Sequence, residues 1–331
     1  MDEVLIIGIE STAHTAGVGI FSSERGIIAN EKSEYKPVEG GIHPREAAEH
    51  HSKAFPSVLK LALKKAECRM RDITAIAVAL GPGMGPCLRI GASLARALAL
   101  KYRKPLVPVN HAIAHIEIAQ YSTGMEDPLV IYVAGGNTLI TTYVEGRYRI
   151  FGETLDISLG NCLDVFARET GLGFPGVPEI EKLYYKGTQL LDLPYVVKGQ
   201  DVSYSGLLTR ALELYKEGYP IEDLCYSLIE IAYSMLVEVA ERALVHTKKK
   251  EIVLTGGVAR SKILQEKLSL MAKVHNAEFS SVKPEYAGDN GAMIAYTGYL
   301  AFTSGIVTPI DKSFIKPLWR LEQVEVLWRK S

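Results

Sequence analysis

Short apolar runs alternate with longer amphipathic stretches along the first third of the chain, and this alternation predicts strands and helices in turn. The first three apolar runs are separated by small turn residues at the spacing of antiparallel hairpins. Helical patterns follow at about 44–65 and 88–101. The strands predicted in this part of the chain are 4–10, 16–22, 26–35, 72–80 and 105–109. The expected order of elements is therefore βββαβαβ.

A similar order of elements starts again after residue 128. The three strands predicted there are 129–136, 138–146 and 148–156. The segment 160–250 is expected to be mostly helical and is a candidate insertion. A strand at 251–257 and helices beginning near residues 261 and 291 complete the pattern. Two halves that each open with three strands predict a duplicated α/β fold, with mixed sheets, flanking helices and a cleft between two lobes.

Composition and charge narrow the class of protein. The 331 residues are 47% apolar and 23% charged, which is typical of a globular protein of more than one domain. The formal net charge is −1, so a polyanionic partner would have to be held by a local patch or by other subunits. No uncharged apolar stretch approaches the roughly 18 residues of a membrane span, and the acidic start predicts no secretory signal. The four cysteines are scattered without a C-x-x-C pair, so we expect a cytoplasmic protein.

The stretch NHAIAHIEIAQ, residues 110–120, places two histidines four positions apart among apolar residues. Asn110 is a good N-cap, so residues 111–121 should be helical, with His111 and His115 on one face. A buried imidazole without a partner costs roughly 1–3 kcal/mol, and a metal shared by both rings would satisfy the pair. The alternative is two core histidines that are each bonded to a backbone carbonyl. A metallopeptidase is disfavoured, because Ala112 stands where that chemistry needs a glutamate.

Three glycine-containing turns, GIEST at 8–12, VAGGNT at 133–138 and LTGGVARS at 254–261, each follow an apolar strand. Glycine at a strand end lets backbone N–H groups approach an anion, so these turns are candidates for binding a phosphate. Other nucleotide motifs fail: no P-loop lysine follows a glycine-rich turn, and Pro86 interrupts the dinucleotide pattern in GPGMGP. Asp289 precedes the last long helix, where it is either an N-cap or a metal ligand facing the cleft.

Taken together, these motifs resemble the tRNA threonylcarbamoyladenosine-forming transferases, in the archaeal and eukaryotic branch of that family. The resemblance extends over most of the chain, in GIESTAHTAGVGI, GGIHPREAAEHH, GPGMGPCLRIG, NHAIAHIE, YVAGGNT, GETLDISLGNCLDVFARETGL, KGQDVSYSGLLT, LTGGVA, AGDNGAMIA and WRLEQVEVLW. It implies the two-lobed fold of actin, hexokinase and Hsp70. The lobes would be residues 1–126 and 127–304, with 305–331 packing back on the first.

The resemblance also implies the site residues. A metal, iron before zinc, would be held by His111, His115, Tyr132 and Asp289. The threonylcarbamoyl-adenylate, or ATP or AMP in its place, would contact Tyr132, Val133, Ala134, Gly135, Gly136, Asp164, Val177, Glu181 and Ser261. Two positions depart from the family pattern, since Val177 replaces a glycine and Ser261 replaces an asparagine. These departures put nucleotide affinity in doubt. No residue is assigned as general base.

The implied reaction is transfer of threonylcarbamoyl from the adenylate to the exocyclic amine of the adenosine that follows the anticodon, position 37, in tRNAs reading ANN codons. Implied partners are tRNA, a separate enzyme that makes the adenylate, and the KEOPS subunits, namely a small kinase/ATPase and dimerising accessory proteins. Two alternatives remain open from sequence. One is a small-molecule kinase on the same fold, which would use Mg²⁺ with oxygen ligands; the other is a non-catalytic nucleotide-sensing subunit.

Overall fold

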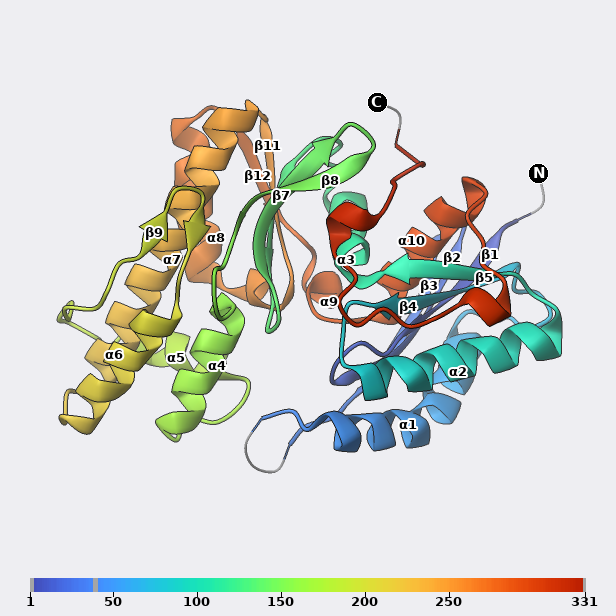
Figure 1. Cartoon of the computed structure of the whole chain (residues 1–331), viewed down its shortest axis with the longest axis horizontal. Helices are drawn as coiled ribbons and strands as arrows, with labels where there is room; N and C mark the ends of the chain where they lie inside the picture. Colours follow the sequence, from blue (N-terminus) through green and yellow to red (C-terminus); the bar gives the residue numbers. More distant parts are fainter. Residues whose placement is uncertain (1–2, 38–40, 330–331) are drawn as a thin grey trace. The chain divides into compact units, whose positions relative to one another are not determined.

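The computed structural model describes residues 3–37 and 41–329, and the chain divides into two compact units (Figure 1). Unit 1 comprises Met1–Ile118, Val144–Tyr148 and Asp289–Ser331; unit 2 comprises Ala119–Tyr143 and Arg149–Gly288. The sequence-based boundaries differ from this division in two main places. Residues 119–126 were expected in the first lobe and belong to unit 2, and residues 289–304 were expected in the second lobe and belong to unit 1.

Unit 1 is built on a mixed five-stranded sheet of order β3-β2-β1-β4-β5. Its strands are β1 (Leu5–Glu10), β2 (Thr15–Ser22), β3 (Gly26–Glu34), β4 (Ala75–Gly81) and β5 (Leu106–Asn110). β1, β2 and β3 pair antiparallel, whereas β1, β4 and β5 pair parallel. All five predicted strands are confirmed, because strand-length apolar runs with turn residues between them are a strong local signal.

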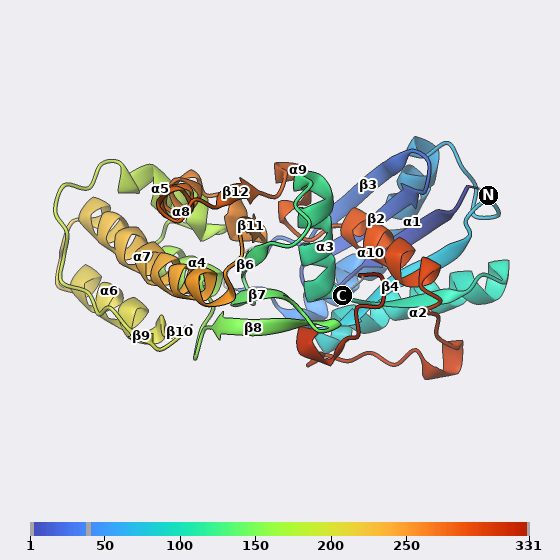
Figure 2. The ribbon, with the colours of Figure 1, turned by 90° about the horizontal axis from the view of Figure 1, so that it is seen from above.

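Helices cover both faces of this sheet. They are α1 (Pro44–Lys65), α2 (Gly85–Tyr102), the start of α3 (His111–Thr123) and α10 (Gly291–Thr303), with the short 3-10 helices η2 (Ile310–Lys312) and η3 (Leu321–Gln323). α1 and α2 lie side by side along one face, and α10 crosses the other (Figures 1 and 2). Side chains such as Ile7 and Ile9 pack in the core with Phe55 of α1. Since alternate residues of a strand face opposite sides, the residues between them face α10.

Glycines let α10 approach the sheet backbone closely. A Cβ at Gly8 would lie 2.1 Å from the Ala295 nitrogen, and one at Gly19 would lie 2.3 Å from the Ala292 nitrogen. A Cβ at Gly291 would in turn lie 2.1 Å from the Gly19 nitrogen. No side chain fits at any of these crossings. The contact of α10 with β1 and β2 is therefore backbone on backbone, which is why α10 belongs to unit 1.

A second five-stranded sheet, of order β12-β11-β6-β7-β8, belongs to unit 2 except for the last residue of β7 and the first two of β8. Its strands are β6 (Leu129–Val133), β7 (Thr138–Val144), β8 (Arg147–Glu153), β11 (Glu251–Thr255) and β12 (Glu278–Ser281). β6 pairs antiparallel with β7 and parallel with β11, which pairs parallel with β12. A separate pair of two-residue strands is formed by β9 (Val197–Lys198) and β10 (Asp201–Val202).

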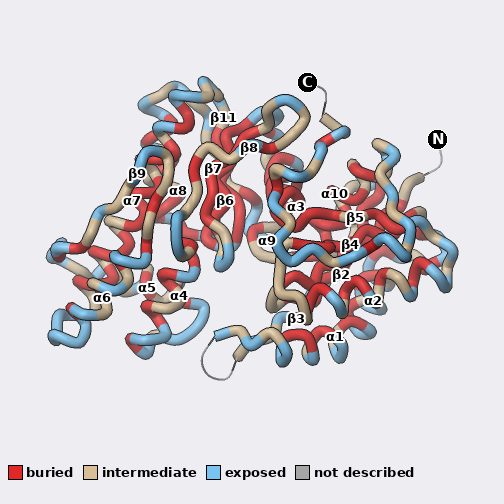
Figure 3. Tube along the Cα trace, in the orientation of Figure 1, coloured by how far each residue is buried: buried red, intermediate tan, exposed pale blue. Residues whose placement is uncertain are grey.

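Helices make up most of the rest of unit 2. They are α4 (Leu159–Glu169), α5 (Gly176–Tyr184), α6 (Ser205–Lys216), α7 (Ile221–Thr247), α8 (Lys262–Val274) and α9 (Pro284–Ala287), with the 3-10 helix η1 (Gly257–Arg260). α7 runs the length of the unit beside α6 (Figure 2). Its buried side chains, such as Leu228 and Met235, belong to the same hydrophobic core as residues of the sheet strands. Figure 3 shows buried stretches in red along α7 and along strands β6 and β7.

Among the described residues, no helix combines the length and the apolar content that crossing a bilayer requires. All four cysteines lie in the described part of the chain and are free thiols, three of them buried.

Asp156 fastens the loop after β8 to the start of α6. Its carboxylate accepts hydrogen bonds from the Ser203 and Ser205 hydroxyls and, at 2.9 Å, from the backbone N–H of Tyr204. Burial raises the pKa of Asp156, but these bonds to the charged form outweigh it and hold the pKa below its usual range. Stability from this carboxylate is therefore present above about pH 4 and is lost as the pH falls.

We expect Asp156→Asn to lose stability at neutral pH and to show a shallower decline toward acid than the parent protein. Urea unfolding of both proteins from about pH 6 to about pH 3 measures this difference in the free energy of unfolding. Parallel pH profiles for parent and variant would show that the bonds to Asp156 do not stabilise the fold.

Candidate metal centre and nucleotide-binding turns

Helix α3 starts directly behind strand β5, so its first turn carries the histidine pair at the end of the sheet. The Asn110 side-chain oxygen accepts hydrogen bonds from the backbone N–H of Ala112 at 3.0 Å and of Ile113 at 3.2 Å. The predicted N-cap is confirmed. His111 is the first residue of the helix, and His115 follows one turn later on the same face. Their ring centroids lie 4.7 Å apart.

Asp289 reaches the same two rings from the turn before α10. The side-chain oxygen of Asn290 accepts from the Met293 N–H at 2.9 Å, so Asn290 is the N-cap of α10 and Asp289 is not. The Asp289 Oδ1 atom instead lies 3.2 Å from Nε2 of His115 and 3.5 Å from Nε2 of His111. The close docking of α10 on β1 and β2 brings this carboxylate to α3, although the two are far apart in sequence.

The three side chains form a set of metal-ligating groups whose donor atoms all lie within 4.8 Å of one another. His115 is fully buried, and His111 is 6% exposed. Two imidazole nitrogens and one carboxylate, largely withdrawn from water, are the ligands that zinc and ferrous iron prefer. The residues present therefore fit the metal that the resemblance implies. The Nε2 atoms of both histidines face this carboxylate, which is unlike a pair of core histidines bonded to backbone carbonyls.

Glu10, at the end of β1, is a site residue that the sequence analysis missed. It is fully buried, and its Oε2 lies 3.0 Å from Nδ1 of His111. Its Oε1 accepts from the Thr12 backbone N–H at 2.6 Å and from the Thr12 hydroxyl at 2.5 Å. Because Glu10 engages Nδ1, the other ring nitrogen of His111 is directed to the metal position. Carboxylates that orient a ligating histidine in this way also strengthen it as a donor.

The charges of the cluster shift its titration. Burial lowers the pKa of His111, but the Glu10 charge and hydrogen bond outweigh it and raise that pKa to about 9. Burial and the neighbouring His111 charge keep the pKa of His115 below its usual value. Burial raises the pKa of Asp289. The hydrogen bond to His115 and the charge of His111 lower it by more, so this carboxylate is ionised. The raised pKa favours the protonated form of His111 in the metal-free cluster, and a metal ion that binds its Nε2 would displace a proton from that nitrogen.

Replacing Glu10 by glutamine should weaken metal binding about 10- to 100-fold, as for other residues that orient a metal-ligating histidine. The amide keeps the shape of Glu10 but loses the negative charge behind His111. Competition against a chelator of known affinity measures the change. Glu49→Gln is the matched control, because Glu49 is an exposed residue of α1 paired with Lys53. Equal affinity in both variants and the parent would remove Glu10 from the site.

The turn after β6, in unit 2, is shaped to approach a ligand with its backbone. Ala134 N–H donates to the Asn137 carbonyl at 2.8 Å, and the Ser158 hydroxyl donates to the Gly135 carbonyl. Gly135 and Gly136 are exposed, and a Cβ at either glycine would meet no atom within 4 Å. The turn is thus held by its own hydrogen bonds and by the cap of α4, while its glycines lie open to solvent.

The turn after β11 lies directly beside it, because β6 and β11 are parallel neighbours. Gly256 has a φ of +97°, and a Cβ there would lie 2.2 Å from the Val133 carbonyl oxygen, so only glycine fits. Of the three glycine turns predicted at equivalent strand ends, the two at 133–138 and 254–261 lie at the ends of neighbouring parallel strands of unit 2, whereas the turn at 8–12 follows β1 of unit 1. Carboxyl ends of adjacent parallel strands are where α/β folds bind nucleotides.

Tyr132 lies in β6, is 1% exposed and pairs in register with Thr255. It belongs to unit 2, whereas His111, His115 and Asp289 belong to unit 1. That Tyr132 is a fourth metal ligand stays a prediction.

Asp164 and Val177 have structural roles that the sequence did not reveal. Asp164, on α4, accepts from the Gly176 N–H at 2.8 Å and so fixes the start of α5. Gly176 must be glycine, since a Cβ there would lie 2.7 Å from the Ala167 side chain. Val177 follows it in α5 and packs its side chain against the core of unit 2. The departure from the family glycine at Val177 therefore adds apolar packing to the first turn of α5.

Glu181 and Ser261 contact each other across α5 and α8. The Ser261 hydroxyl donates to Oε1 of Glu181 and accepts from the Leu264 N–H at 3.1 Å, which makes it the N-cap of α8. The Tyr233 hydroxyl also donates to Glu181, at 3.1 Å. Burial raises the pKa of Glu181, although these bonds partly oppose it. Serine at 261 thus retains the capping oxygen that an asparagine would supply, and it holds a carboxylate in place.

The sequence of this chain is similar to that of a known protein family. Residues 25–296 match the model of the TsaD family, described as tRNA N6-adenosine threonylcarbamoyltransferase. A curated protein of Thermofilum pendens with that name is 63% identical over 330 residues, covering 99% of this chain and 98% of its own. A protein of Sulfurisphaera tokodaii with the same name is 56% identical, covering 98% and 99%.

Solved structures are similar in fold alone. HypF of T. kodakarensis aligns with a TM-score of 0.63 at 16% identity, over 92% of this chain and 48% of its own. An activator of 2-hydroxyisocaproyl-CoA dehydratase from Clostridium difficile, solved with bound ADPNP, aligns with a TM-score of 0.56 at 14% identity, over 91% and 97%. These likenesses confirm the expected actin-like fold. With the family match and the curated relatives, they place the chain in the family of the tRNA N6-adenosine threonylcarbamoyltransferases, so it is an enzyme of the acyltransferase class.

Proposed function

We propose that this chain transfers the threonylcarbamoyl group of threonylcarbamoyl-adenylate to the N6 amine of the adenosine that follows the anticodon of tRNA. The nitrogen attacks the carbamoyl carbon, a C–N bond forms, the bond to the phosphate oxygen breaks, and AMP leaves as the amine loses a proton. The observation that carries the proposal is the largely buried cluster of His111, His115 and Asp289, in a chain whose curated relatives are named tRNA N6-adenosine threonylcarbamoyltransferase. A kinase using Mg²⁺ has no need of two imidazoles.

The residues of unit 2 supply the adenylate site in this proposal. The exposed turn of residues 134–137 offers backbone N–H groups to the phosphate. Glu181, held by Ser261 and Tyr233, and Asp164 on α4 are carboxylates suited to ribose hydroxyls and the adenine amine. Because AMP is a good leaving group, the main task of these residues is to orient the donor.

His111, His115 and Asp289 would hold one metal ion, with Tyr132 as a fourth ligand, and iron is proposed before zinc. When bound, such an ion supplies Lewis-acid polarisation and a fixed point for orienting the donor. Glu10 keeps Nδ1 of His111 engaged, so that Nε2 is available.

A single-turnover assay tests the proposal. The full chain, loaded with iron or with zinc, is mixed with synthetic threonylcarbamoyl-adenylate and an unmodified tRNA transcript, with and without partner subunits. Formation of threonylcarbamoyladenosine in the tRNA supports the function, and elemental analysis of the active sample identifies the metal. ATP-dependent phosphorylation of a small molecule, with no modified tRNA under any loading, would favour the kinase instead.

We also propose that the chain works in the cytoplasm as a subunit of a KEOPS assembly. A formal net charge of −1 gives the chain little attraction for a polyanion, so accessory subunits would supply much of the grip on tRNA. A small kinase/ATPase subunit and a separate enzyme that makes the unstable adenylate complete the proposed set of partners. Co-purification with tagged chain, followed by mass spectrometry, identifies them.

Glu181→Gln is expected to weaken binding of an adenine nucleotide about tenfold. The carboxylate of Glu181 is a charged acceptor for a ribose hydroxyl or the adenine amine, and the amide that replaces it is neutral. Isothermal titration with AMP measures it. Glu179→Gln is the matched control, since Glu179 lies on the same helix and pairs with Lys182 at the surface. A Glu181 variant that binds AMP as tightly as the control would exclude this carboxylate from the nucleotide site.

A further inference from the structure

The turn between β1 and β2, residues 11–14, is held by three successive hydrogen bonds from other parts of unit 1. The carbonyls of Thr12 and His14 each accept a backbone N–H at 2.8 Å, from the loop before α2 and from the residue after β3. Between them, the Ala13 carbonyl lies 3.1 Å from Nε2 of His51, a residue of α1. Two of these contacts are therefore backbone on backbone, and the contact from α1 is made by one imidazole.

This turn sets the carboxylate behind the first ligating histidine. Oε1 of Glu10 accepts the backbone N–H of Thr12 at 2.6 Å and its hydroxyl at 2.5 Å. Oε2 of the same carboxylate lies 3.0 Å from Nδ1 of His111, and the Thr12 hydroxyl oxygen lies 3.2 Å from that nitrogen. A shift of the turn would therefore move the groups that orient the His111 ring.

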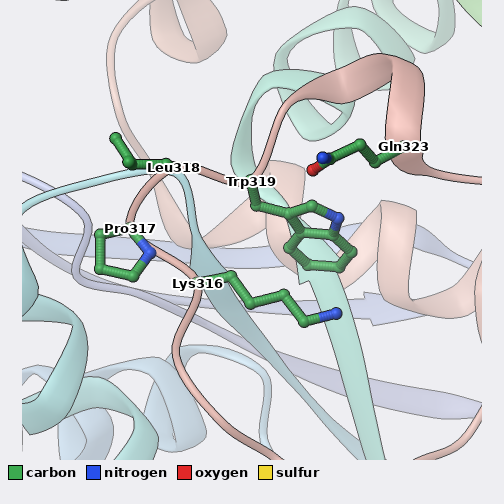
Figure 4. A pocket seen from close by; sticks show the side chains of 5 residues that line it. All are labelled: Lys316, Pro317, Leu318, Trp319 and Gln323. Atoms are coloured by element: carbon green, nitrogen blue, oxygen red, sulfur yellow. The ribbon is translucent and has the colours of Figure 1, made fainter.

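The loop before α2 presses on the turn with its backbone. The Met84 N–H donates to the Thr12 carbonyl, and a Cβ at Gly83 would lie 2.6 Å from the same oxygen. The Gly83 N–H donates in turn to the Pro317 carbonyl at 3.1 Å. Pro317 belongs to the C-terminal segment, where it lines an open hollow of about 400 Å³ together with Trp319 (Figure 4). On this side the turn is thus fixed by main chain.

On the side of α1, the His51 ring can donate to Ala13 in one tautomer only, because a carbonyl oxygen accepts and does not donate. His51 is fully buried, and burial together with the neighbouring His50 lowers its pKa to about 4, so the ring is neutral near pH 7. With the proton on Nε2, its Nδ1 is an acceptor. Nδ1 of His50 lies 3.3 Å from that atom and therefore carries a proton.

The second ring is set in the same way from β3. Burial lowers the pKa of His50, so this ring is neutral too, and its Nε2 is an acceptor. The Ser33 hydroxyl lies 2.9 Å from this Nε2 and donates to it. The hydrogen bonds therefore run in one direction, from Ser33 through His50 and His51 to the Ala13 carbonyl.

We propose that His51 is a positioning residue of the metal centre: it holds the turn that sets Glu10, and Glu10 sets the ring of His111. Partners of this kind fix the tautomer and the orientation of a ligating histidine. The alternative is a core histidine that only stabilises unit 1. The inference rests on the metal centre of the proposed function but not on the transfer reaction.

Nitrogen–proton NMR correlation spectra of the histidine rings test the hydrogen-bond chain by itself. The full chain is measured near pH 7 with zinc, which is diamagnetic. We expect the proton of His51 on Nε2 and that of His50 on Nδ1, each signal being assigned by its loss in His51→Gln or His50→Gln. A proton on Nδ1 of His51, or rapid exchange between its tautomers, would overturn the proposal, because the bond to Ala13 would then not be fixed.

Chelator competition measures the effect on the metal centre. His51→Leu removes the donor at nearly constant volume and should weaken zinc binding about tenfold, the lower end of the effect of residues that orient a ligand. His51→Gln should restore most of the affinity, because the glutamine amide N–H can reach the position of Nε2. Val58→Ala is the matched control. Val58 is buried on the same face of α1, so this variant should lower the unfolding temperature and leave zinc affinity unchanged.

A double-mutant cycle shows whether His51 acts through Glu10. In a Glu10→Gln background, His51→Leu should cause less than about a twofold further loss of zinc affinity, because the link between the turn and the ring of His111 is already broken. Losses that simply add would show that His51 does not act through Glu10 and would overturn the proposal.

The remaining outcomes separate this inference from the centre on which it rests. A parent chain that binds neither zinc nor iron would overturn both together. A parent chain that binds zinc, with His51→Leu lowering the unfolding temperature alone, would overturn this inference and leave the metal centre standing. Because no transfer is measured, failure of the proposed reaction would not change these results.

Discussion

Replacing His111 and His115 together by alanine is expected to abolish metal binding and reduce threonylcarbamoyl transfer by at least about a hundredfold, with the fold retained. The two imidazoles are two of the three groups that converge on one point, and Asp289 alone cannot hold a transition metal against water. Removing both also leaves the buried Glu10 and the partly buried Asp289 without their imidazole partners, so some loss of stability is expected.

The measurements for this variant are metal content after purification and single-turnover transfer, with circular dichroism as the check on folding. His275→Ala is the control, because His275 pairs with Glu241 at the surface of unit 2 and takes no part in the cluster. His111→Ala alone leaves His115 and Asp289 in place and measures how much metal binding these two groups retain. If the double variant contained no metal and still transferred threonylcarbamoyl at the rate of the parent protein, the metal centre would have no part in the reaction.

Local sequence signals were enough to predict the half of the metal centre that α3 supplies. An asparagine cap followed by two histidines four apart fixes a helix start and a shared face, whatever the rest of the fold does. The structure confirms that geometry at Asn110, His111 and His115. The sequence left open whether Asp289 caps α10 or ligates a metal; the structure gives the cap to the adjacent Asn290, a residue type that caps helices as well as aspartate does.

Contacts over long sequence separations were beyond local reasoning. Glu10 meets His111 across a separation of 101 residues, and nothing in GIEST indicates that its acid turns inward rather than toward a nucleotide. The position of α10 was mispredicted for the same reason: chain order placed it in the second lobe, whereas glycines in β1 and β2 dock it on the first sheet. Strand β12 was not predicted, because three of its four residues, EFSS, are polar and it lies at the sheet edge.

Gly19→Ala is expected to destabilise unit 1 by about 1–3 kcal/mol and to weaken metal binding, although residue 19 touches no ligand. The added Cβ would lie 2.3 Å from the Ala292 nitrogen, so the backbone of α10 must move away from β2. A flexible side chain could turn aside, but here both partners are backbone held by a helix and a strand. Asp289 stands just before α10 and must move with it, while the histidines on α3 stay in place.

Thermal unfolding and chelator competition together test this coupling of packing to the site. Gly206→Ala is the control: Gly206 lies in α6 with no atom within 4 Å of an added Cβ, so alanine there should stabilise by about 0.5–1 kcal/mol. A lower unfolding temperature with unchanged metal affinity would mean that Asp289 is held by the turn before α10 and not by the docking of the helix. Loss of both in Gly19→Ala, and in Gly8→Ala at the next crossing, would show that the glycines of β1 and β2 set the ligand geometry through α10.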